Sequence, residues 1–240
     1  FMIRSGFEKV RFGFASENTN SDIALWAKKY IYGGALSVFP EFAHENRAFS
    51  AKGVSENGVN AGEIAEIYKY LTEIFAENKK NITVKIAAFT EKQVKAIRFF
   101  VDKKMTVTEN ISLITENVCS SFADCDCLIV SSVFSGSKSD IRYLSDAEDL
   151  IGGAERLLRY LLTAKKAVVA VSSLPGDCAD TRPVTPGIRV FCRLFKYLSE
   201  KKNTLSAGEK EQIPHDIYAD KLDSNGKTYI RSEFIENLYI

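Results

Sequence analysis

Two segments of this chain have the composition to contact phosphate groups. Gly152-Gly153 opens a predicted helix, whose N-terminus could meet an anion, but Glu155 in its first turn disfavours one, so we favour a plain turn. In the polar loop from Ser135 to Asp149, the segment from Ser135 to Lys138 and Arg142 could touch phosphates, although we favour a solvated loop. No G-x-x-x-x-G-K-[ST] phosphate loop and no G-x-S-x-G nucleophile elbow occurs, so the sequence predicts no catalytic residue.

The cysteines and histidines do not form a metal or acid–base pattern. Cys119, Cys125 and Cys127 are close in sequence, but their spacing does not match that of zinc ligands, so we favour small core thiols. His44 stands among acidic residues, and we favour an exposed histidine over an acid–base catalyst. The sequence therefore predicts no metal site.

Composition is that of an ordinary globular protein with one large domain or two small ones. The 240 residues are 45% hydrophobic, and 32 basic against 31 acidic residues give a net charge of +1. This balance excludes a global attraction to nucleic acid or membrane but leaves a local basic face open. Because no apolar run reaches the roughly 18 residues of a membrane span and no signal-peptide core is present, we expect a cytoplasmic protein.

Apolar periodicity predicts helices that alternate with buried strands. Helices are expected over 21–32, 61–78, 91–103, 153–163 and 187–201, and strands over 42–50, 82–89, 112–117, 127–133 and 167–173. Nearly continuous apolar strands favour a mostly parallel sheet covered by helices on both faces. We expect a three-layer α/β domain over 1–202 and an extension over 203–240, where Ser224-Asn225-Gly226 predicts a hairpin.

The order of these elements resembles the second RecA-like domain of superfamily 1 DNA helicases of the large bacterial type. Residues 24–40 are similar to the segment that opens that domain, and residues 60–93 to its strand followed by a threonine loop with a glutamine. Residues 116–136 look like the fifth helicase motif, and residues 152–202 resemble the closing glycine turn, helix, strand and final helix. The resemblance covers roughly residues 12–201 and implies a P-loop NTPase-type fold without the P-loop.

Site residues and partners follow from this resemblance. It implies that ATP and magnesium bind only in the complete motor, between this domain and an N-terminal motor domain, and that the motor grips DNA, single-stranded in particular. It places nucleotide contacts at Gln93, Lys165 and Lys166, and nucleic-acid contacts at Thr90 and Ser120, to which we add Ser135. No cofactor is expected in the isolated chain, and no membrane partner.

The chain departs from the family pattern where the chemistry would take place. Ala15 and Glu17 stand where the family has arginines, and Lys165 and Lys166 replace the arginines that follow the helix threonine. Lysine lacks the planar fork of arginine, and loss of an arginine finger lowers the rate on the order of 10³-fold. The fifth motif has Cys119-Ser120 in place of glutamine-glycine. We therefore expect the isolated chain not to hydrolyse ATP.

The sequence is compatible with three functions, of which we expect the first. The first is a helicase domain that acts only together with an N-terminal motor domain. The second is a degenerate, helicase-like scaffold or protein-interaction module without ATPase activity. The third, a small-molecule-binding α/β enzyme, has no catalytic constellation to support it.

Overall fold

The computed structural model describes residues 20–30, 45–77, 81–105, 111–135, 140, 147, 149–174 and 185–201. Its helices are α1 (Ser21–Tyr30), α2 (Ala61–Glu77), α3 (Glu91–Lys104), α5 (Ala154–Leu161) and α7 (Pro186–Lys201). Its strands are β1 (Arg47–Ser50), β2 (Ile82–Ala88), β3 (Ile111–Asn117), β4 (Cys125–Ser131) and β5 (Ala164–Ser172).

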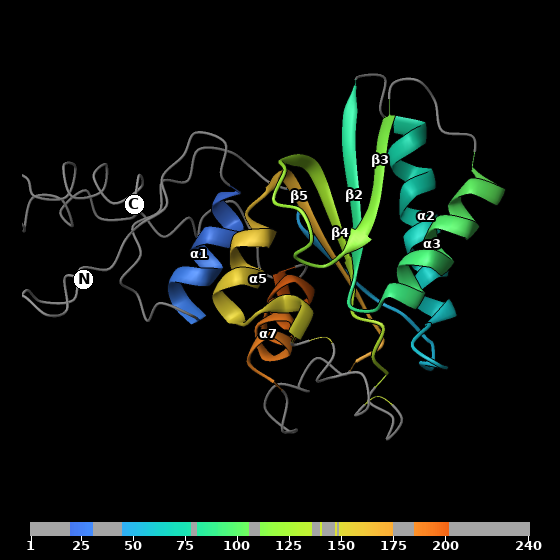
Figure 1. Cartoon of the computed structure of the whole chain (residues 1–240). Coiled ribbons are helices and arrows are strands. Elements are labelled where there is room, and N and C mark those ends of the chain that lie inside the picture. The colour runs from blue at the N-terminus through green and yellow to red at the C-terminus, as the bar shows by residue number, and fades with distance from the viewer. Residues whose placement is uncertain are drawn as a thin grey trace, which may run out of the picture.

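The strands form one sheet in the order β1-β5-β4-β2-β3, and every neighbouring pair is parallel. Helices α2 and α3 cover one face, and α1, α5 and α7 cover the other (Figure 1). This arrangement confirms the predicted three-layer α/β fold with a parallel sheet.

Each face of the sheet carries its own apolar core, because successive side chains of a strand point to opposite faces. One core joins β2 and β4 to α2 and α3, and includes Ile67, Leu71, Val84, Ile97 and Ile129. The other lies under α1, α5 and α7, and includes Trp26, Phe89, Leu128, Tyr160 and Phe191. Burial on both faces explains why the central strands are apolar along nearly their whole length.

The end of α5 differs from the prediction. The helix ends at Leu161 instead of residue 163, and Thr163 turns back by donating its N–H and its hydroxyl to the Tyr160 carbonyl. The Thr163 carbonyl then accepts the N–H of Cys125, which starts the pairing of β5 with β4. Lys165 and Lys166 therefore lie inside β5, whereas the sequence predicted that they precede a strand beginning at 167.

Several predictions fall outside the described residues. These are the arginine-replacing Ala15 and Glu17, the histidine His44, the loop residue Arg142, residues 31–32 and 42–44 of predicted elements, and the hairpin at 224–226 in the extension 203–240. The predicted polar loop 135–149 is partly helical, since Ala147 and the residues from Asp149 to Ile151 adopt helical backbone. Within the described ranges, no helix is both long and apolar enough to cross a membrane.

Candidate functional site

The carboxyl edge of the sheet contains a point where the chain connections diverge. Helix α3 leads from β2 to β3 on one face, and α5 leads from β4 to β5 on the other, so the connections part between β2 and β4. In open α/β sheets, ligands bind outside the carboxyl ends of the strands at such a point. A ligand site of this kind would therefore be formed by the residues that follow β2 and β4.

A buried carboxylate, Glu63, occupies this point. It lies in the first turn of α2 and is fully buried. One of its oxygens accepts the Ser131 hydroxyl at 2.6 Å and the Val133 N–H at 2.8 Å. The other accepts the Ser132 hydroxyl and the Ser173 N–H, both at 2.9 Å. Glu63 thus ties the end of β4 to the end of β5 across the sheet edge.

Two buried amides extend this polar network. Asn60 caps α2 by accepting the Glu63 N–H, and its amide group donates to the Val133 carbonyl and the Ser173 hydroxyl. Gln93 accepts the Asn60 N–H at 2.8 Å and donates to the Asn60 carbonyl and the Ser131 hydroxyl. The Gln93 amide, for which the helicase resemblance implied an ATP contact, is therefore engaged within the protein on both its oxygen and its nitrogen.

The loop between β1 and α2 folds over the same edge. Glu56 and Val59 pair across Asn57 and Gly58, whose φ angles of 54° and 81° are those of a tight hairpin turn. The Thr90 hydroxyl donates to the Gly58 carbonyl at 2.6 Å. It also accepts the N–H of Gln93, so that Thr90 caps the N-terminus of α3. Thr90 is consequently 8% exposed, and the chain itself fills the space beside it.

Val133, directly after β4, has an unusual backbone. Its φ is +70°, a left-handed conformation that is sterically costly for a β-branched residue, by about 1–3 kcal/mol. The side chain is buried, and its N–H is one of the four donors to Glu63. The bond to Glu63 therefore helps to hold the chain in this strained turn.

The electrostatics of Glu63 result from two opposing effects. Burial away from bulk solvent raises the pKa of Glu63, while the four hydrogen-bond donors stabilise the carboxylate and lower the pKa. Burial is the larger effect, and it raises the pKa of Glu63 from 4.5 to about 7. The carboxyl group therefore changes its charge near neutral pH while it holds the two strand ends.

A second polar feature lies beside the carboxyl end of β3, on the face covered by α5. The loop 118–124 carries Phe122, and the guanidinium carbons of Arg156 and Arg159 lie 5.8 and 5.3 Å from the centre of its ring. Arg156 also donates to the Cys119 carbonyl at 3.0 Å. Both arginines are exposed, and within the described part of the chain neither has an acidic partner. We call Phe122, Arg156 and Arg159 the arginine–aromatic patch.

Predicted nucleic-acid contacts gather at one edge of the sheet. Thr90, Ser120 and Ser135 follow β2, β3 and β4, which are adjacent parallel strands. Ser120 is exposed, whereas Ser135 is half-buried and its hydroxyl bonds the Ser55 N–H and the Asp140 carboxylate. Of the three, Ser120 is the one whose side chain faces solvent freely and lies next to the arginine–aromatic patch.

Predicted ATP contacts do not converge. Lys165 and Lys166 lie at the amino end of β5 and form ion pairs with Asp124 at 3.1 Å and Asp126 at 2.8 Å. The seven steps along the strand from Lys165 to Ser172 span about 23 Å, at about 3.3 Å per residue. The two lysines are therefore at the opposite edge of the sheet from Gln93.

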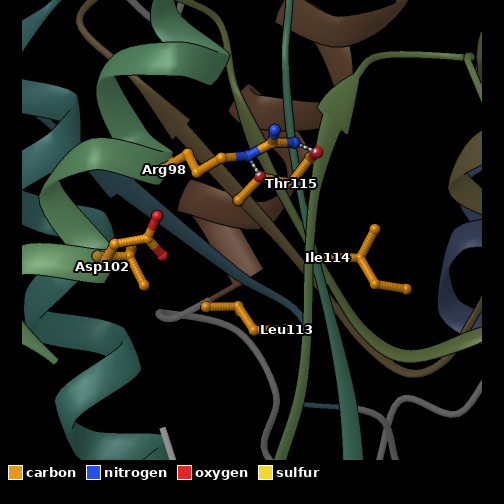
Figure 2. A pocket seen from close by; sticks show the side chains of 6 residues that line it. Arg98, Asp102, Leu113, Ile114 and Thr115 are labelled. Carbon is orange, nitrogen blue, oxygen red and sulfur yellow. Dashed lines mark hydrogen bonds between the residues drawn. The ribbon is translucent and has the colours of Figure 1, made fainter. Parts of the chain in front are cut away.

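A hollow on the surface lies away from both features, beside the edge strand β3. Its volume is about 410 Å³, and it is lined by Arg98, Val101, Asp102, Leu113, Ile114 and Thr115 (Figure 2). Arg98 donates to the hydroxyl and the carbonyl of Thr115, both at 2.9 Å. A charged side chain on an outward-facing carbonyl protects an edge strand from pairing with another chain, so we assign Arg98 this structural role.

The cysteines nearest to the candidate site are buried thiols. Cys119, Cys125 and Cys127 are free, and burial raises their pKa values to about 12, 11 and 12. Cys192 on α7 is disulfide-bonded. In the residues whose structure is described, no group of three or more His, Cys, Asp or Glu side chains could hold a metal ion.

The residues that dominate the site were not predicted from the sequence. Glu63 follows Asn60 by three positions, a spacing typical of a helix capping box, which is the signal that could have drawn attention to it. Arg156 and Arg159 are three apart on one helix and therefore share a face. No protein-family model and no curated protein sequence matches this chain.

Proposed function

We propose that this chain is the second RecA-like domain of a cytoplasmic, helicase-type motor, and that it binds a nucleic-acid strand at the carboxyl edge of its sheet. The parallel sheet and the motif order described above support this proposal. The observation that carries it is the arginine–aromatic patch beside Ser120. The proposal includes an N-terminal motor domain as partner, because this chain has half of the site at most.

Physical properties of the patch fit a phosphate-containing strand. Two guanidinium groups lie near one aromatic ring, so their positions are partly fixed before a ligand arrives, which lowers the entropy lost on binding. Each exposed guanidinium can offer paired N–H donors to a phosphate. The half-buried Phe122 ring supports both guanidinium groups through cation–π contacts.

The described residues do not form an ATP site by themselves. Gln93 is buried and fully hydrogen-bonded, and Lys165 and Lys166 are paired with aspartates at the other edge. ATP and magnesium therefore belong, in this proposal, to the complete motor, whose N-terminal domain would supply the phosphate loop. The isolated chain is expected to show no ATP turnover, and measurable turnover by it would contradict the proposed division of the site.

Titration of a fluorescently labelled single-stranded DNA with the full 240-residue chain tests the nucleic-acid site. Binding should weaken with salt, and the double variant Arg156→Gln/Arg159→Gln should lower the slope of log K against log salt by about 1.4, at about 0.7 per lost phosphate contact. Lys103→Gln/Lys104→Gln, which removes two exposed cations from the end of α3 on the other face, is the matched control. Salt-insensitive binding, or equal effects of the two double variants, would contradict the proposal.

A scaffold without nucleic-acid binding is the second candidate. It is favoured by the Glu63 network, which fills the point where α/β sheets usually bind ligands. In that case the wild-type chain would not bind the oligonucleotide at any salt concentration, and the arginine–aromatic patch would contact a protein.

A further inference from the structure

We propose that Lys85, a buried lysine in the middle of β2, is a positioning residue that holds the loop 118–124 in the shape required for binding. The proposal rests on the proposed function for the identity of the ligand. The order of the loop itself can be measured without any ligand, so the two proposals can fail separately.

The Lys85 ammonium group is directed at this loop and its base. The side chain is 1% exposed, and its ammonium group donates to the Ala123 carbonyl at 2.7 Å and the Ser121 carbonyl at 3.2 Å. The Glu116 carboxylate lies 3.3 Å away. An ammonium group has three N–H donors, and these three oxygens match them in number.

The position of Lys85 indicates that its ammonium group is needed for hydrogen bonding to the loop. The surrounding residues of β2, from Val84 to Ala88, are otherwise apolar and buried. Burying an ammonium group is costly unless it is paired and hydrogen-bonded, and an apolar side chain would fill a strand interior at lower cost. An apolar side chain could not, however, bind the two loop carbonyls.

The same lysine connects the loop to the helix that carries the two arginines. Glu116 accepts the Tyr160 hydroxyl at 2.6 Å, and the Lys85 ammonium lies 5.4 Å from the Tyr160 ring centre. Tyr160 belongs to α5 and meets the Phe122 ring edge to face, with the centres 5.9 Å apart. Lys85, Glu116 and Tyr160 thus form one buried unit beneath the arginine–aromatic patch.

The loop is held from two sides as a result. Arg156 binds the Cys119 carbonyl at its start, and Lys85 binds the carbonyls of Ser121 and Ala123 on either side of Phe122. Removal of Lys85 would free the segment that presents the Phe122 ring. The two guanidinium groups would then lose their common support although neither arginine had been changed.

Lys85→Met tests this role, because methionine keeps an unbranched chain and removes the ammonium group. We expect the Kd for single-stranded DNA to rise about three- to tenfold through lost preorganisation, with an unchanged salt slope because no phosphate contact is removed. Hydrogen exchange of the amides in 119–124 should become faster. The matched control is Val84→Ala, which weakens the core on the opposite face of β2 and should leave both readouts as in the wild type.

Two further variants keep the test decisive. Tyr160→Phe removes the hydrogen bond to Glu116 without leaving a buried charge unpaired, and should speed hydrogen exchange of the loop less than Lys85→Met does. It provides a test of the loop even if Lys85→Met does not fold. In the Arg156→Gln/Arg159→Gln background, Lys85→Met should add no further loss of affinity.

Unchanged exchange of the loop in both Lys85→Met and Tyr160→Phe would overturn the positioning role. A changed salt slope in Lys85→Met would also overturn it, since that would mean a direct phosphate contact. If the loop loosens as expected while the wild-type chain binds no DNA, the positioning role stands and the proposed nucleic-acid function fails.

Discussion

Replacement of Glu63 with glutamine should change how the stability of this protein depends on pH. The pKa of Glu63 is about 7 in the folded chain, against an ordinary value of 4.5. Between these values the folded chain keeps the proton and the unfolded chain has lost it. The stability that this proton contributes is therefore fully present below pH 4.5 and is lost as the pH rises through about 7.

The magnitude follows from the two pKa values. Their difference is 7 − 4.5 = 2.5. At 1.36 kcal/mol for each pH unit, the wild type should lose about 3 kcal/mol of unfolding free energy relative to Glu63→Gln between about pH 4.5 and pH 7.5. Glutamine does not titrate, so this difference isolates the carboxyl group.

The absolute effect of Glu63→Gln is a poorer measure than its pH dependence. Each carboxylate oxygen accepts one serine hydroxyl and one backbone N–H. A hydroxyl can rotate to accept a bond from the new amide group, but a backbone N–H cannot, and one unpaired buried N–H costs about 1–3 kcal/mol. That cost does not vary with pH.

Urea unfolding of the wild type and Glu63→Gln, measured at intervals from pH 4.5 to 8, is the assay. Glu73→Gln, which removes an exposed carboxylate from the same helix, controls for the loss of one negative charge. The unfolding free energy of the wild type minus that of Glu63→Gln should decrease as the pH rises. A difference that stays constant or grows with pH would refute the reasoning, because it would mean that the four donors outweigh burial.

Two further substitutions test the packing of the loop over the sheet edge. Gly62→Ala would ordinarily stabilise a helix by about 1 kcal/mol. Here the new Cβ would lie 2.5 Å from the Lys52 carbonyl oxygen, so the thermal unfolding midpoint should fall. A higher midpoint would contradict the packing. Thr90→Ala should lower the free energy of unfolding in urea by about 1–2 kcal/mol, because it removes the α3 cap and the bond to Gly58. Thr90→Ser keeps the hydroxyl and should retain most of the wild-type stability. Equal losses in the two variants would show that the hydroxyl is unimportant.

Much of the fold could be predicted from the sequence because its apolar runs are continuous. ITVKIAAF and CLIVSSV predict buried strands without reference to the rest of the chain, and their burial on both faces implies a parallel sheet. The order of the strands could not be predicted in this way. Periodicity does not encode which strands are neighbours, and the four residues of β1 are too few to signal their pairing with β5.

The candidate site was less predictable, for a related reason. Gln93 and Thr90 have the residue types and the edge position of ligand contacts, but their hydrogen bonds go to Asn60 and Gly58, more than 30 positions away. Lys85 is visible in the sequence as one charge in an apolar strand, yet its meaning depends on carbonyls 36 and 38 positions later. A sequence pattern shows that a polar group must be satisfied, but not which distant group satisfies it.

The place of β1 in the sheet has a consequence for synthesis on the ribosome. Arg47 is opposite Val169, so the partner of β1 is made 169 − 47 = 122 residues later. At about 5–20 residues per second, this gap lasts on the order of 6–24 s. The unit of α2, β2, α3 and β3 has its neighbours much sooner, whereas in the part of the chain that the structure describes β1 pairs with β5 alone. The first strand of the sheet to be synthesised is therefore among the last to be built into it.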